Sequence, residues 1–131
     1  MKDKLIVVAG GGGFIGGHLV GHFLAKGHKR IRSVDVKPLD EWYQTLDGAE
    51  NLVLDLKDKD ACDQATAGAS EVYNLAADMG GMGFIENNKC LCMLSVLTNP
   101  HMILAAQEGG ADRFFYASSA CVYNADKQKD P

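Results

Sequence analysis

The chain has 131 residues, 47% of them hydrophobic and 23% charged, and 17 acidic against 13 basic side chains give a net charge of −4. This length and composition predict one soluble domain with a single core, spanning residues 1–131. No apolar run approaches the ~20 residues of a membrane helix, and we read no signal peptide at the start. A weakly acidic chain without a block of Lys and Arg is not expected to bind nucleic acid or a membrane.

The cysteines and histidines give no metal-binding pattern. The chain has four cysteines, none of them in a Cys-x-x-Cys pair: Cys62, Cys90, Cys92 and Cys121. Without a secretory signal we expect a reduced, cytoplasmic setting, and we expect Cys62, Cys90 and Cys92 to be packing residues. His18 and His22 are four apart, but no third ligand accompanies them. We therefore predict no metal site.

Short β-rich segments alternate with helical patterns, which is typical of a parallel sheet built from β-α-β units. Residues 5–9 are all apolar, as in a strand buried on both faces. Ile15, Leu19 and Phe23 then recur every four residues and predict a helix, which Gly27 can end in a left-handed conformation. Residues 31–36 predict the second strand. Residues 38–49 are a loop or a short helix.

The second half of the chain continues the same alternation. It predicts strands at residues 52–54, 71–76 and 113–119 and a short polar helix at 57–66. A longer helix is expected from about residue 87 to 108, ended by Gly109, with Pro100 kinking it or ending its first part. The predicted fold class is α/β, a Rossmann-like, doubly wound parallel sheet of about five strands.

Gly10, Gly13 and Gly16 are spaced three apart where the first strand turns into the first helix. In such turns the first glycine permits the tight bend and the second lets the backbone approach a pyrophosphate. The third lets helix and strand pack closely. The phosphates then meet the free amides at the positive end of the helix. Glycine makes up 15 of the 131 residues, and much of this excess over the usual ~7% lies here and at residues 80–83.

Asp35 ends the second strand, 19 residues after Gly16, where a carboxylate can bind the adenosine ribose hydroxyls of a dinucleotide. Its negative charge repels a 2′-phosphate, so we expect NAD rather than NADP as the cofactor. Lys37, two residues further on, would soften that preference. The alternative is an ordinary solvated aspartate at the end of a strand.

With these motifs the chain resembles the extended short-chain dehydrogenase/reductase family, the NAD-dependent nucleotide-sugar epimerases and dehydratases. The resemblance rests on GGGGFIGGHLV from residue 10, on Asp35, on Asp55-Leu56, on NLAA at 74–77 and on FFYASSACVY at 114–123. It covers the N-terminal part of the family's enzyme. It implies NAD contacts for Gly10, Gly13, Phe14, Ile15, Gly16, Asp35, Asp55, Leu56, Leu75, Ala76 and Ala77.

Two segments resemble one branch of this family, the GDP-mannose 3,5-epimerases: NLAADMGGMGFI at 74–85 and RFFYASSACVY at 113–123. Methionine-glycine clusters of that kind are not a general family feature. The resemblance implies a nucleotide-sugar substrate similar to GDP-mannose, contacted by Gly80, Ser119, Ala120 and Cys121. For Gly80, a loop glycine without such a contact is the alternative.

Ser119 and Cys121 lie two apart at the end of the expected fifth strand and project from the same face if the strand stays extended. That end faces the crevice where open α/β sheets bind ligands. By resemblance, Ser119 orients the reacting sugar hydroxyl, and Cys121 exchanges protons with sugar carbons beside a transient 4-ketone. A thiol, whose ordinary pKa is about 8.5, is suited to that exchange. For Cys121, a small buried apolar residue is the alternative.

The family also uses a Tyr-x-x-x-Lys pair on a later helix. Tyr123 and Lys127 have this spacing, but Tyr123 follows Ser119 by only four residues, and residues 124–131 show no apolar helical face. We therefore expect the chain to stop before the catalytic helix, to be inactive alone, and to expose apolar surface. This predicts a homo-oligomer or a complementing C-terminal polypeptide.

The main functional hypothesis is the NAD-binding part of a nucleotide-sugar epimerase. Two alternatives remain open. One is a non-catalytic dinucleotide-binding module, and the other is part of a nucleotide-sugar 4-epimerase or 4,6-dehydratase.

Overall fold

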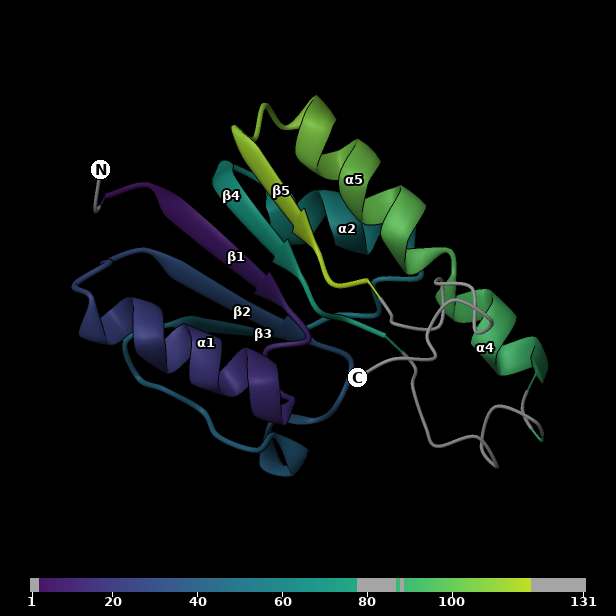
Figure 1. Ribbon diagram of the computed structural model, residues 1–131, viewed down its shortest axis with the longest axis horizontal. Helices are drawn as coiled ribbons and strands as arrows, with labels where there is room; N and C mark the ends of the chain where they lie inside the picture. The colour runs from purple at the N-terminus through teal and green to yellow at the C-terminus, as the bar shows by residue number, and fades with distance from the viewer. Residues whose placement is uncertain (1–2, 78–86, 88, 119–131) are drawn as a thin grey trace, which may run out of the picture.

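The computed structural model describes residues 3–77, 87 and 89–118. Five parallel strands form one sheet in the order β3-β2-β1-β4-β5. Helix α1 covers one face of the sheet, and α2 and α5 cover the other (Figure 1). This strand order is that of doubly wound dinucleotide-binding folds, so the predicted fold class is confirmed.

The helices and strands follow the predicted alternation, with bounds shifted by a few residues. They are β1 (Leu5–Ala9), α1 (Phe14–Ala25), β2 (Ile31–Asp35), the short 3₁₀ helix η1 (Leu39–Glu41), β3 (Glu50–Val53), α2 (Lys59–Thr66), β4 (Ala69–Asn74), α4 (Lys89–Ser95), α5 (Thr98–Glu108) and β5 (Arg113–Tyr116). No helix among the described residues is long and apolar enough to cross a membrane.

Strand β1 is the centre of the molecule, and its alternating side chains divide the core in two. All five of its residues are buried. Ile6 and Val8 pack with Val20 of α1, whereas Leu5 and Val7 belong to the cluster that α2 and α5 cover. The prediction of a strand buried on both faces is confirmed, because successive strand side chains point to opposite faces.

Helix α1 begins directly after Gly13 and is followed by Gly27, whose φ of 82° gives the left-handed stop that was predicted. The predicted apolar stripe is partly wrong, since Ile15 is 70% exposed. The buried residues of α1 are Gly16, Gly17 and Val20. The physical reason is close packing: the helix presses its glycines, and not its first apolar residue, against the preceding turn.

Residues 42–48 form an extended connection that we call the strap, in the region where the sequence predicted either a loop or a short helix. It runs beside α1 between η1 and β3 (Figure 1). Alternate strap side chains lie on glycines of the turn and the helix: Trp42 on Gly12, Gln44 on Gly17 and Leu46 on Gly21. Part of the glycine excess therefore serves packing, because Trp42 and Gln44 occupy space that a Cβ on Gly12 or Gly17 would need, whereas Leu46 would only be in ordinary contact with a Cβ on Gly21.

The predicted long helix after β4 is divided into α4 and α5, as Pro100 suggested. The break lies at residues 96–97, so Pro100 falls in the first turn of α5, where a backbone amide has no intrahelical partner to lose. At its other end α5 stops at Gly110, whose φ is 75°. The amide of Ala111 there donates to the carbonyl of Ala106 at 2.9 Å, a common closing bond of helices.

Of the cysteines, the side chains of Cys62 and Cys90 are described, and one is buried and the other exposed. Cys62 is fully buried in α2 and donates to the carbonyl of Leu56 at 3.1 Å, as expected for a packing residue. Cys90 is exposed, so its predicted packing role is wrong. Its place on α4 leaves it outside both core clusters.

Candidate dinucleotide site

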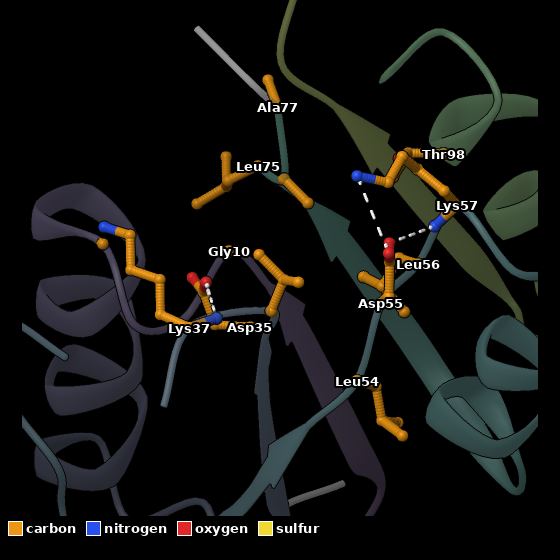
Figure 2. Close-up of a pocket in the computed structure, with 13 residues that line it drawn as sticks. Gly10, Asp35, Lys37, Leu54, Asp55, Leu56, Lys57, Leu75, Ala77 and Thr98 are labelled. Carbon is orange, nitrogen blue, oxygen red and sulfur yellow. Dashed lines mark hydrogen bonds and ion pairs between the residues drawn. The ribbon is translucent and has the colours of Figure 1, made fainter. Parts of the chain in front are cut away.

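A pocket opens at the carboxyl ends of β1 to β4, on the edge where doubly wound sheets bind ligands. Asp35 and Lys37 lie on one side of it, and Asp55, Lys57 and Thr98 on the other (Figure 2). Among the described residues, the pocket is lined by Gly10, Gly13, Asp35, Val36, Lys37, Leu54, Asp55, Leu56, Lys57, Leu75, Ala76, Ala77 and Thr98.

Most residues predicted to contact NAD meet in this one pocket, although they come from four separate strand ends. Phe14, Ile15 and Gly16 do not line it but form the first turn of α1 beside it. Sequence reasoning missed Val36, Leu54 and Lys57, whose signal was their position next to the two aspartates. It also missed Thr98, for which the sequence held no signal. Thr98 enters the pocket only through the break before α5.

The glycine turn is built by contacts that leave no room for side chains. Gly10 has a φ of 80°, and a Cβ there would lie 2.9 Å from the main chain of Leu75. A Cβ on Gly16 would lie only 2.1 Å from the carbonyl oxygen of Gly10. The turn is therefore pressed against the end of β4 on one side and against α1 on the other. The amides of Gly10 and Gly11 hold it to β2 by donating to the carbonyl of Val34 at 2.8 and 3.0 Å.

The start of α1 has the chemistry of an anion site. No side chain caps the helix, and its first turn carries no acidic residue. The first intrahelical bond runs from the amide of Gly17 to the carbonyl of Gly13, so the amides of Phe14, Ile15 and Gly16 have no intrahelical acceptor. These donors and the positive end of the helix dipole fit a pyrophosphate lying against Gly13.

Asp35 is fixed at the end of β2 by two main-chain donors. Its Oδ2 accepts the amide of Gly12 at 3.1 Å, and its Oδ1 accepts the amide of Lys37 at 3.2 Å. Figure 2 shows the second of these bonds and the carboxylate at the pocket wall. A carboxylate in this place suits the paired hydroxyls of a ribose, because it offers acceptors only.

The opposite wall repeats the same local arrangement. Asp55 Oδ1 accepts the amide of Lys57 at 3.0 Å, and Asp55 Oδ2 lies 3.6 Å from the Lys57 ammonium (Figure 2). Asp35 thus ends β2 and Asp55 follows β3, and each is oriented by the amide two residues later. Thr98, only 6% exposed, closes this wall from the start of α5.

Helix α5 is anchored by polar contacts to the end of β4 and to the segment between β3 and α2. Asn74, 1% exposed at the end of β4, donates from Nδ2 to Asn99 Oδ1 at 2.6 Å. Its own Oδ1 accepts the amide of the pocket residue Ala76 at 3.3 Å. His101 Nδ1 lies 3.0 Å from the carbonyl of Lys57. These contacts fix the positions of Ala76 and Lys57 relative to the sheet.

The two histidines of α1 are exposed and contact aromatic rings. His18 lies in a group of aromatic rings with Phe14 and Tyr43, whose centroids are 4.6 and 5.4 Å from its own. His22 contacts Phe23, at 6.2 Å between centroids. Within residues 3–77, 87 and 89–118, no group of three metal-binding side chains is found.

The residues predicted for the sugar and for catalysis lie outside the described residues. These are Gly80, Ser119, Ala120 and Cys121, together with the spaced pair Tyr123 and Lys127. The described part of the chain ends at residue 118, just before Ser119, and there the amide of Ala117 donates to the carbonyl of Asn74 at 3.3 Å.

Comparisons with known proteins agree with this geometry. GDP-mannose 3,5-epimerase 1 of Oryza sativa subsp. japonica is 42% identical over 129 residues, which are 97% of this chain and 34% of that protein. Epimerase Mth375 of Methanothermobacter thermautotrophicus shares the fold, with a TM-score of 0.80 and 23% identity over 95% of this chain and 38% of that one. A short-chain dehydrogenase/reductase superfamily protein of Agrobacterium tumefaciens, solved with bound NAD, has a TM-score of 0.72. It is 27% identical, over 88% of this chain and 33% of that one.

The chain spans about a third of the length of the curated relatives it matches. The family model for NAD dependent epimerases and dehydratases matches residues 6–131. Together with the strand order, the glycine turn and Asp35, this match shows that the chain belongs to the NAD dependent epimerase/dehydratase family.

Proposed function

We propose that this chain is the NAD-binding part of a nucleotide-sugar epimerase of the GDP-mannose 3,5-epimerase type, with residues 1–131 forming one NAD-binding domain. The observation that carries the proposal is that Asp35 lies in one pocket with Gly10 and Gly13, beside the uncapped start of α1. Identity of 42% to a GDP-mannose 3,5-epimerase supports the choice of substrate class.

Each wall of the pocket has a separate task in this proposal. The amides of the glycine turn and of the first turn of α1 hold the pyrophosphate. Asp35 accepts the hydroxyls of the adenosine ribose, and its charge disfavours a 2′-phosphate. Asp55 and Leu56, with Leu75 to Ala77, enclose the adenine end. When bound, NAD supplies the hydride acceptor that transient oxidation of a sugar requires.

For the sugar, the proposal keeps the roles predicted from sequence. Gly80 and Ala120 contact the nucleotide-sugar, Ser119 orients the hydroxyl at the 4-position, and Cys121 exchanges protons with the neighbouring carbons. The proposed partner is either a second copy of this chain, bound through exposed apolar surface, or a complementing C-terminal polypeptide, which would carry the Tyr-x-x-x-Lys pair.

The cofactor step is tested by titrating the chain with NAD in a calorimeter and comparing Asp35→Asn. We expect NAD to bind, and Asp35→Asn to weaken it about ten- to hundredfold, because a hydrogen bond to a charged group contributes about 1.5–3 kcal/mol. Asp112→Asn is the matched control, since it makes the same charge change just before β5, at the other end of the sheet. A folded chain that does not bind NAD would refute the cofactor assignment.

The substrate step is tested by adding GDP-mannose and NAD to the chain, with and without a C-terminal polypeptide from a related epimerase. We expect solvent deuterium to enter the sugar only when that polypeptide is present. The non-catalytic module is the second candidate, because the described lining of the pocket, which gathers most of the predicted NAD contacts, suits a binding module equally well. NAD binding without deuterium exchange in the complemented sample would support that candidate.

A further inference from the structure

The two amides that orient Asp35 are themselves held from behind. Gly12 and Lys37 donate their N–H groups to the two carboxylate oxygens. Their carbonyl oxygens face the other way, toward the start of the strap. The indole Nε1–H of Trp42 donates to the carbonyl of Lys37 at 2.8 Å. The amide of Tyr43 donates to the carbonyl of Gly12 at 2.9 Å.

Trp42 also fixes Gly12 by contact. The residue is only 7% exposed, and a Cβ built on Gly12 would lie 2.8 to 2.9 Å from three atoms of the indole ring. The ring therefore rests directly on the glycine main chain and blocks its displacement away from Asp35. The amide of Trp42 donates to the carbonyl of Leu39 in η1 at 3.3 Å, which holds the indole at the head of the strap.

We propose that Trp42 is a positioning residue for Asp35: it fixes both main-chain donors of the carboxylate and thereby sets how well the pocket recognises the ribose 2′-hydroxyl. The proposal rests on the proposed NAD site. It goes beyond that site because Trp42 does not line the pocket, and acts only through Gly12 and Lys37.

Positioning and general packing predict different losses when Trp42 is changed. If the indole only packs the strap against α1, weaker packing reduces the affinity for every dinucleotide by the same factor. If it orients Asp35, the loss falls on ligands that carry the 2′-hydroxyl. The discrimination between NAD and its 2′-deoxyadenosine analogue therefore falls as well.

The test measures the dissociation constants of NAD and of 2′-deoxyadenosine NAD for the full chain and for Trp42→Phe. Phenylalanine keeps a ring over Gly12 but has no donor for the Lys37 carbonyl. We expect the dissociation constant of 2′-deoxyadenosine NAD divided by that of NAD to fall about three- to tenfold. This is the range for loss of one hydrogen bond's orienting effect.

Leu46→Ala is the matched control, because Leu46 packs the same strap on Gly21 and touches neither donor of Asp35. We expect it to lower the melting temperature while keeping the wild-type ratio. Trp42 is the single tryptophan of the chain, so growth on benzothienylalanine replaces only its N–H by sulfur. This second variant keeps the shape of the indole and should reproduce the fall in ratio even where Trp42→Phe is poorly folded.

Amide hydrogen exchange provides a readout that needs no ligand. We expect the Gly12 and Lys37 amides to exchange faster in the Trp42 variants than in Leu46→Ala. Wild-type binding of NAD with an unchanged ratio in both Trp42 variants would overturn the inference and leave the proposed function intact. Absence of NAD binding to the wild-type chain would overturn both, whereas the exchange result would still show whether Trp42 holds the two donors.

Discussion

Among the described glycines, Gly16 is the one at which an added Cβ would come closest to main-chain atoms. A Cβ there would lie 2.1 Å from the carbonyl oxygen of Gly10, 2.7 Å from its carbon, and 2.9 Å from the Cα of Gly11. All three are main-chain atoms, so no rotamer change relieves the contact. Gly16→Ala must therefore push the glycine turn away from α1, and with it the main chain that lines the pocket.

The size of the effect follows from two opposing contributions. Overpacking a close contact costs about 1–3 kcal/mol, and clashes with main chain lie at the upper end. Alanine inside a helix returns about 1 kcal/mol relative to glycine. We therefore expect Gly16→Ala to lower the free energy of unfolding by about 2 kcal/mol and to abolish measurable NAD binding, because the displaced turn no longer meets the pyrophosphate.

Gly21→Ala is the matched control in the same helix. A Cβ on Gly21 would lie 3.5 Å from a methyl group of Leu46, an ordinary contact. This variant should gain most of the helix propensity, about 0.5–1 kcal/mol, and bind NAD as the wild type does. Urea denaturation and calorimetry measure both quantities. Equal stability and equal NAD affinity in the two variants would refute the close-packing account of the turn.

Four further predictions concern residues outside the turn. Burial raises the pKa of the Cys62 thiol from 9.0 to about 12. The stability that the buried neutral thiol contributes is therefore complete below pH 9 and is lost as the pH rises toward 12. Urea titrations should show that the free energy of unfolding declines less steeply with pH in Cys62→Ala, and identical slopes would contradict this. At pH 8 iodoacetamide should modify exposed Cys90 well before buried Cys62, which peptide mass mapping measures. Modification of both thiols at the same rate would contradict the burial of Cys62. Asn99→Ala leaves the buried Asn74 amide without its acceptor and should cost about 1–3 kcal/mol, whereas Asn99→Asp keeps an acceptor; equal melting temperatures for these two variants would argue against the bond. Arg32 donates to carbonyls at the end of α2, at 2.9 to 3.3 Å, so Arg32→Met should lower the melting temperature more than Arg32→Lys does, and the reverse order would count against this role.

The sheet and its ligand edge could be predicted because their signals are local. The apolar run of β1, the glycine turn after it and Asp35 at the end of β2 each lie within one strand and its exit. Parallel strands then bring their carboxyl ends to one edge without further information. For this reason most of the predicted cofactor residues meet in a single pocket, although the sequence does not show which strands pair.

The strap could not be predicted, because its partners lie on another element and carry no side chain. Trp42, Gln44 and Leu46 alternate as in an extended segment, but their contacts are glycines of the turn and of α1. The glycine pattern had already been assigned to phosphate binding. The exposure of Ile15 was missed for the same reason. Four-residue spacing predicts a helix but not which of its sides faces the sheet, and here Gly16 and Gly17 set that orientation.

The break before α5 was predictable only in part. Pro100 marked the region where one helix would not continue, yet the chain breaks earlier so that the proline lies in a first turn. Only this placement brings Thr98 into the pocket and Asn99 to the end of β4. The spacing of residues in the sequence does not predict where Thr98 and Asn99 lie, because their positions depend on how α5 packs across the sheet.

The most direct measurement for the whole account is an NAD titration of the isotope-labelled chain followed by amide chemical shifts. NAD bound as described should shift the amides of residues 10–16, Asp35, 55–56 and 75–77, which line or flank the pocket. It should leave those of residues 29–32, at the opposite end of β2, unchanged. Shifts confined to that opposite end, or no shifts at millimolar NAD, would contradict it.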